Sequence, residues 1–213
     1  MGGGARLPSP VCDEDLLPVT DGVVSQKVDV GLKTKLVSLF QNEGTVAVDV
    51  LSKIAAAKPA EYGNVCLRIN SPPMAFTTVP TVPDLSFITV LKITRARGLR
   101  SLEGLGGMEG LKMITVNYCD LKEFPELPGS AMLVDLGDNA IAKIGEGVGV
   151  GGGLRSLDLS GNLLGAGSLS GLGRICAGNE GLKNLAVGAN FFTEEAIAEF
   201  EEREEVMIKL VVE

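Results

Sequence analysis

Histidine is absent from the 213-residue sequence. Ser-His-Asp and Cys-His catalysis both use an imidazole as the general base, so this absence excludes them, along with metal sites that contain histidine. No G-x-x-x-x-G-K-[ST] loop is present to hold the phosphates of a nucleotide. We therefore expect a protein that is not an enzyme and that holds no metal and no cofactor.

Cysteine is sparse, and its placement indicates a reducing compartment. The four cysteines are far apart, none belongs to a C-x-x-C pair, and no N-x-S/T glycosylation site occurs. These are Cys12, Cys66, Cys119 and Cys176. We expect the protein to lie in the cytoplasm or the nucleus.

Long apolar runs are missing as well. No stretch reaches the roughly 18 residues that a membrane span needs, and no secretory segment is visible. The net charge of -8 argues against a nucleic-acid partner held through its phosphates. These features predict neither a membrane nor a direct nucleic-acid partner.

What the sequence does contain is a repeat. In "LRSLDLSGN" (154–162) the spacing Leu154, Leu157, Leu159, Asn162 fits neither a helix nor a simple strand. The same offsets recur in "LKNLAVGAN" (182–190), "AMLVDLGDN" (131–139), "LKMITVNYC" (111–119) and the degenerate "ITVLKITRA" (88–96), with weaker copies around Leu67 and Ile208. Counted from the fourth position, the register runs 67, 91, 114, 134, 157, 185 and 208.

This pattern resembles the leucine-rich repeat family, whose motif L-x-x-L-x-L-x-x-N/C-x-L returns every 20 to 29 residues. The resemblance covers about 64–213 and mixes repeat types, so it assigns no subfamily. It implies an α/β fold: a right-handed solenoid with a curved parallel sheet of about seven strands and a small helical N-terminal cap. Each repeat would be one short strand and a return segment, with its leucines buried only by stacking.

The ninth position of each copy is expected to be structural. It lies where the chain leaves the strand, so its side chain can bond main-chain groups that would otherwise be buried without partners. Asn139, Asn162, Asn190 and Cys119 occupy this position. We predict that they form a hydrogen-bonding ladder and take no part in catalysis.

The segments between the strands differ in character. The stretch 121–130 is short and contains prolines, which predicts an extended return. The longest repeat instead has near-helical apolar spacing, at Leu164, Leu169, Leu172 and Ile175. After Asn190 we expect a helix that starts at the N-cap Thr193, ends near Glu204 and packs through Ala196, Ile197 and Phe200.

The rest of the chain divides into three parts. Residues 1–28 lack a sustained period and are expected to be flexible. Candidate helices at about 29–41 and 45–57 make 29–60 a cap over the first repeat, and 61–213 would form the solenoid. "GVGVGG" (147–152) matches G-x-G-x-x-G, but it precedes a strand where a dinucleotide site must follow one.

Two rows of side chains are predicted on the concave face. The fifth positions are Arg68, Lys92, Thr115, Asp135, Asp158, Ala186 and Lys209, and the third positions are Cys66, Val90, Met113, Leu133, Ser156, Asn184 and Met207. The first row changes from basic to acidic, and beside it runs an apolar stripe with Tyr118 near the rim. The candidate partner-binding residues are Arg68, Val90, Lys92, Met113, Thr115, Tyr118, Leu133, Asp135 and Asp158.

In leucine-rich repeat proteins the concave sheet commonly binds a protein partner. The resemblance thus implies a non-enzymatic protein-protein interaction module, monomeric when free, whose partner the sequence does not name. Two alternatives stay open: a regulatory subunit of a phosphatase- or GTPase-type enzyme, and an architectural subunit of a large assembly such as a ribonucleoprotein particle or an axoneme. Ordinary solvated surface residues would give the same pattern on the face.

Overall fold

The computed structural model describes residues 65–70, 77–79, 86, 88–145, 152–204 and 209–211. The regular structure consists of short strands and a few helices between them. The strands are β1 (Val65–Asn70), β2 (Ile88–Thr94), β3 (Met113–Asn117), β4 (Leu133–Asp135), β5 (Ser156–Asp158), β6 (Asn184–Ala186) and β7 (Lys209–Val211). The helices are the 3-10 helices η1 (Glu103–Gly107) and η2 (Ala166–Ser168) and the α-helices α2 (Leu169–Ala177) and α3 (Glu194–Glu204).

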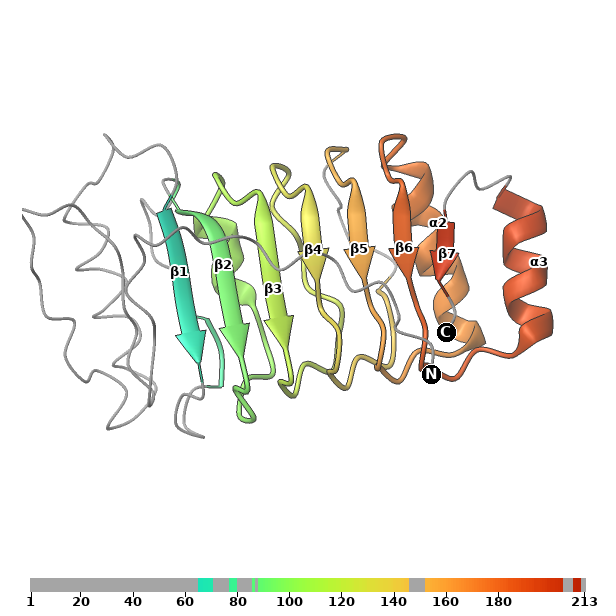
Figure 1. Cartoon of the computed structure of the whole chain (residues 1–213), viewed down its shortest axis with the longest axis horizontal. Coiled ribbons are helices and arrows are strands. Elements are labelled where there is room, and N and C mark those ends of the chain that lie inside the picture. The colour runs from blue at the N-terminus through green and yellow to red at the C-terminus, as the bar shows by residue number, and fades with distance from the viewer. Residues whose placement is uncertain are drawn as a thin grey trace, which may run out of the picture.

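The seven strands form one parallel sheet in chain order, β1 to β7, and appear side by side in Figure 1. Their central inward residues pair from strand to strand and are almost completely buried. This ladder consists of Leu67, Leu91, Ile114, Val134, Leu157 and Leu185. The predicted register is confirmed at these six positions, as is a leucine-rich-repeat-like α/β fold with a parallel sheet.

The last strand departs from the predicted register by two residues. Lys209 pairs with Asn184 and Val211 with Ala186, so Leu210 rather than Ile208 pairs with Leu185. Lys209 therefore lies in the row of third positions, and the prediction that it was a fifth position is wrong. The physical reason is the two-residue period of a strand: a slip of two keeps every side chain on its face, so alternation cannot detect it.

The ladder of asparagines joins each repeat to the one before it. The side-chain oxygens of Asn139, Asn162 and Asn190 accept the backbone N–H groups of Leu121, Ile141 and Leu164 at 2.9–3.4 Å. Their amide groups donate to carbonyls of their own turn and of the preceding repeat. The structural role predicted for these three residues is confirmed. Cys119 occupies the same place, and its thiol donates to the Asn117 carbonyl at 3.3 Å.

A residue with left-handed backbone precedes each ladder position. Arg95, Tyr118, Asp138, Gly161 and Ala189 have φ between 52° and 67°, and each is followed at once by position 96, 119, 139, 162 or 190. Only one of the five is a glycine, although this conformation costs the other residue types free energy. The turn that leaves the strand thus has the same shape in five repeats, whatever residue occupies it.

The return segments behave as their sequences predict, with one addition. Residues 121–130 contain no helix, and the longest repeat carries α2, whose Leu172 and Ile175 are buried. Helix α2 approaches the preceding return closely: a Cβ built on Gly171 would lie 2.6 Å from the Cβ of Ile144. The 3-10 helix η1, which the repeat pattern did not predict, lies within the return segment between β2 and β3.

Helix α3 has the predicted bounds. It begins after Thr193, whose hydroxyl oxygen accepts the N–H of Ala196 at 3.2 Å, and it ends at Glu204. Hydrogen bonds from its own backbone and from the Thr193 hydroxyl lower the pKa of the exposed Glu195. Ile197 and Phe200 are buried, and Ala196 is half-buried. The N-cap and the inner face are confirmed.

Several expectations fall on residues outside the described part of the chain. They are the flexible segment 1–28, the cap 29–60 and most of the glycine-rich stretch 147–152, of which only Gly152 is described. They stay predictions. No helix in the described ranges is long and apolar enough to cross a membrane.

Candidate functional site

The face of the sheet that points away from the leucine ladder carries the predicted site, and we call it the outward face. Its apolar row is continuous over three adjacent strands, because Val90 of β2 pairs with Met113 of β3 and Met113 with Leu133 of β4. All three side chains are half-buried. Since parallel strands lie about 4.8 Å apart, they form one apolar strip, which we call the apolar row.

The charged row runs beside it. Arg68, Lys92, Thr115, Asp135 and Asp158 occupy matching positions on β1 to β5, and Ala186 follows on β6. The order from basic to acidic across the sheet is therefore as the register predicts. For Arg68 the structure describes the backbone position but not the side chain.

Two of the predicted site residues are less accessible than simple alternation implies. Thr115 is 5% exposed and Asp158 is 7% exposed, and Ser156 in the next row is also buried. The register places these residues on the outward face, but their side chains are buried there. They are short and stand between neighbours in the same row, and the Asp158 carboxylate turns back to accept the N–H of Ser160 at 2.9 Å.

Asp135 is fixed in a similar way by the strand beside it. One carboxylate oxygen accepts the side-chain amide of Asn117 at 2.9 Å, and the other accepts the N–H of Gly137 at 3.1 Å. The free oxygen of that Asn117 amide, Oδ1, is buried and, like the hydroxyl of Ser156, has no hydrogen-bond partner within the described residues. Asn117 was not singled out from the sequence, although its place at the end of β3 beside Asp135 follows from the register.

Tyr118 lies at the rim of the outward face, as expected. It directly follows Asn117 at the end of β3, its φ is 57°, and 45% of its surface is exposed. The left-handed turn raises this large side chain out of the strand. The structure thus brings together Val90, Lys92, Met113, Leu133 and Asp135 as a partly accessible group, with Tyr118 at its edge and Thr115 and Asp158 beneath its surface.

The described residues offer little for covalent or metal chemistry. Burial raises the pKa of the Cys119 thiol to about 11, which outweighs the opposing effect of a hydrogen bond from the Ala96 backbone. Such a thiol is protonated at neutral pH and is a poor nucleophile. Within the described ranges no three Cys, Asp or Glu side chains gather as a metal site would require.

Comparison with known proteins adds a distant likeness. No protein-family model matches the sequence, and no curated protein matches it. One similar solved structure is the internalin inlF from Listeria monocytogenes, with a TM-score of 0.49 and 17% sequence identity. The aligned region covers 73% of this chain and 49% of the internalin chain, so the chain spans about half the length of that protein.

Proposed function

We propose that this protein is a non-enzymatic interaction module, a leucine-rich repeat solenoid that binds another protein on its outward face. The observation that supports the proposal most is the apolar row, in which Val90, Met113 and Leu133 lie next to one another on three adjacent strands and stay partly accessible. A partly exposed apolar strip with charged residues along its side has the composition of an interface centre and rim.

Charge would orient the partner on this surface. Lys92 lies toward β1, and the exposed Arg95 and Lys112 extend the basic half, whereas Asp135 and Asp138 lie toward β4 and β5. Asp135 is hydrogen-bonded to β3 and to its own turn, and Asp158 is hydrogen-bonded to its own turn, so both contribute negative potential more than direct contact. We therefore expect the partner to be acidic over β2 and β3 and basic over β4 and β5.

The compartment forms part of the same proposal. Within the described residues Cys119 is a buried thiol that forms no disulfide. This supports a reducing location, the cytoplasm or the nucleus, where the partner would be found.

The test is substitution of the apolar row. Replacing Met113 and Leu133 by aspartate should abolish capture of the protein that co-purifies with the wild type, because loss of an interface centre mainly raises the off-rate. The melting temperature shows whether the variant is folded. As a matched control, Leu163 and Phe191 are 46% and 69% exposed and lie after the strands, outside the outward face. Their replacement by aspartate should leave capture intact, and loss only in this control would refute the proposal.

The charge contribution needs a separate variant. Changing Arg95 and Lys112 to glutamate should slow association and weaken its salt dependence, with little effect on the off-rate. These two are better choices than Asp135 and Asp158, whose replacement would also break hydrogen bonds within the fold. Association and dissociation rates measured at two ionic strengths distinguish a loss of long-range attraction from a loss of direct contacts.

A further inference from the structure

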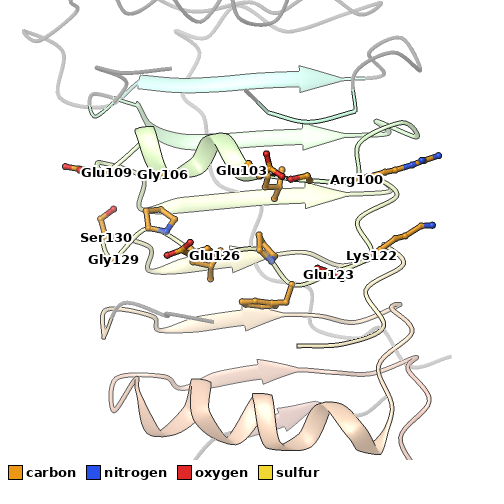
Figure 2. Close-up of a pocket in the computed structure, with 15 residues that line it drawn as sticks. Arg100, Glu103, Gly106, Glu109, Lys122, Glu123, Glu126, Gly129 and Ser130 are labelled. Carbon is orange, nitrogen blue, oxygen red and sulfur yellow. Dashed lines mark hydrogen bonds between the residues drawn. The ribbon is translucent and has the colours of Figure 1, made fainter. Parts of the chain in front are cut away.

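A groove of about 950 Å³ opens on the opposite side of the molecule, where the return segments lie. One wall is formed by residues 100–109, which include η1, and the other by residues 122–130. Figure 2 shows these two return segments, with the side chains that line the space between them. Its volume lies at the upper end of the range of ligand pockets, roughly 300–1,000 Å³.

The groove coincides with a gap in the pairing of the return segments. Ser101 pairs with Thr78 on one side, and Glu123 pairs with Lys143 on the other. No bridge joins Ser101 to Glu123 in the part of the chain that the structure describes. Consecutive returns are thus bridged on both flanks of the groove but not across it.

The main chain of the second wall faces this gap at Glu123. The Lys122 carbonyl accepts the N–H of Ala142 at 3.1 Å, and the N–H of Phe124 donates to the Lys143 carbonyl at 3.4 Å. In an extended chain, alternate residues present their N–H and C=O groups to opposite edges. The N–H and C=O of Glu123 therefore point toward the groove, where an extended peptide could pair with them as an added strand does.

Charges of opposite sign lie at the two ends of the groove. In Figure 2 Arg100 and Lys122 lie at one end, Glu109 lies at the other, and Glu103 and Glu126 lie between them. The carboxylate of Glu123, by contrast, forms an ion pair with Lys143 at 3.1 Å. The charge of the groove thus changes from positive to negative along its length. A ligand that matches it carries a negative charge at one end and a positive charge at the other.

The groove also has an apolar base and unfilled space. Leu102, Phe124 and Leu127 are buried beneath it, and Pro125 and Pro128 are half-buried beside them. At its far end a Cβ built on Gly106 or on Gly129 would meet no atom within 4 Å. Small apolar side chains of a bound segment could therefore pack here without displacing the wall.

We propose that this groove binds an extended peptide segment of a partner protein, with a basic residue toward Glu103, Glu109 and Glu126 and a carboxylate toward Arg100 and Lys122. The pairing gap supplies main-chain hydrogen bonds, and the polarised ends supply direction. This second surface does not depend on the outward face, so either can fail without the other.

Three synthetic peptides of one composition test the proposal on the full chain. The probes are acetyl-Lys-Arg-Ala-Val-Thr-Val-Asp-Glu-amide, its reversed sequence, and a version in which the same charges are mixed at both ends. Fluorescence anisotropy should show at least tenfold tighter binding of one of the first two over the mixed version. Equal affinity for all three would overturn the proposal, as would equally tight binding of a wholly basic peptide, since a chain of net charge -8 attracts any cation.

Variants locate the binding. Gly106→Leu fills the groove and should weaken the favoured peptide at least tenfold, whereas Gly167→Leu, also in a 3-10 helix with nothing within 4 Å of its Cβ, should leave affinity unchanged. Glu103→Lys combined with Glu126→Lys should weaken it to a similar degree. The Met113→Asp, Leu133→Asp double variant should bind the peptide as the wild type does. If that variant alone loses the peptide, the peptide binds the outward face and the groove assignment is wrong.

Discussion

The side-chain oxygen of Asn162 accepts the backbone N–H of Ile141, which belongs to the preceding repeat, at 3.0 Å. The amide of the same side chain donates to the carbonyls of Leu136 and Leu159, each at 2.9 Å. One buried side chain therefore satisfies main-chain groups of two successive repeats. Asn139 and Asn190 repeat this arrangement on either side.

Removing this connection should be costly. Asn162→Ala leaves the buried N–H of Ile141 without its partner. The carbonyls of Leu136 and Leu159 each lose one of two donors and keep the amides of Asn139 and Asn190. At about 1–3 kcal/mol for an unsatisfied buried group, the free energy of unfolding should fall by about 1–3 kcal/mol. Asn184→Ala, at an exposed site on β6, should change it by less than about 0.5 kcal/mol. Urea denaturation measures both, and equal effects would show that the ladder does not stabilise the stack.

The buried strand positions give a second prediction. Leu157→Ala should lower the free energy of unfolding by about 2–5 kcal/mol, because it removes a fully buried side chain from the middle of the leucine ladder. Arg155→Ala, exposed and just before the same strand, should lie within about 0.5 kcal/mol of wild type. Asp158 is unsuitable as the control, since its carboxylate is buried and hydrogen-bonded. The opposite order of effects would contradict the place of Leu157 in the ladder.

Gly171 tests the close approach of α2 to the return before it. A methyl group there would lie 2.6 Å from Ile144, and such overpacking costs about 1–3 kcal/mol, more than the helix propensity that alanine adds. Gly171→Ala should therefore lower the melting temperature. Gly167→Ala meets no atom within 4 Å and should leave the melting temperature unchanged or raise it. A more stable Gly171→Ala variant would mean that α2 packs less closely than described.

For the left-handed turns we predict that two substitutions change the free energy of unfolding in opposite directions. Ala189 has φ of 52°, so Ala189→Gly should raise the free energy of unfolding by about 0.5–1 kcal/mol after the entropy cost of glycine is included. Gly161→Ala should lower it by more than that amount, because its Cβ would also lie 2.7 Å from the Asp138 carboxylate. Thermal unfolding of both variants checks the signs, and a destabilised Ala189→Gly would contradict the account of this turn.

The buried thiol of Cys119 predicts a loss of stability at alkaline pH. Its pKa is raised from 9.0 to about 11 by burial, so the unfolded chain loses this proton first as the pH rises. Unfolding then becomes easier between about pH 9 and 11, by up to roughly 3 kcal/mol for a two-unit shift. The Cys119→Ala variant should show a shallower decline over this range. Identical pH profiles would mean that the thiol does not titrate late in the folded state.

The repeat spacing predicted the inward ladder from β1 to β6 and the asparagine bonds, because both depend on fixed offsets within each repeat. The bounds of α3 followed from a local signal, the N-cap Thr193. Burial on the outward face did not follow from alternation. Alternation gives the direction in which Thr115 and Asp158 point, but their exposure depends on the neighbours around them. The register of β7 could not be predicted either. Ile208 and Leu210 are two residues apart, so the two-residue period of a strand does not distinguish between them.

The structure of the return segments was the hardest part to predict from the sequence. The 3-10 helix η1 forms over "EGLGG", whose three glycines do not favour a helix. Asn179 follows α2, where its side chain accepts the N–H of Leu154 at 2.9 Å and donates to the Ile175 carbonyl at 2.9 Å. This second link between repeats lies outside the repeat motif. The groove beside η1 likewise arises from two returns of different shape, and no single repeat encodes it.

The central claim, that a partner binds the outward face through the apolar row, is tested most directly by site-specific photocrosslinking. A photoreactive phenylalanine analogue placed at position 113 on β3 should crosslink the co-purified partner in high yield, and one at position 163, also partly exposed, should not. Crosslinking at 163 with none at 113, in variants that melt like the wild type, would contradict the claim.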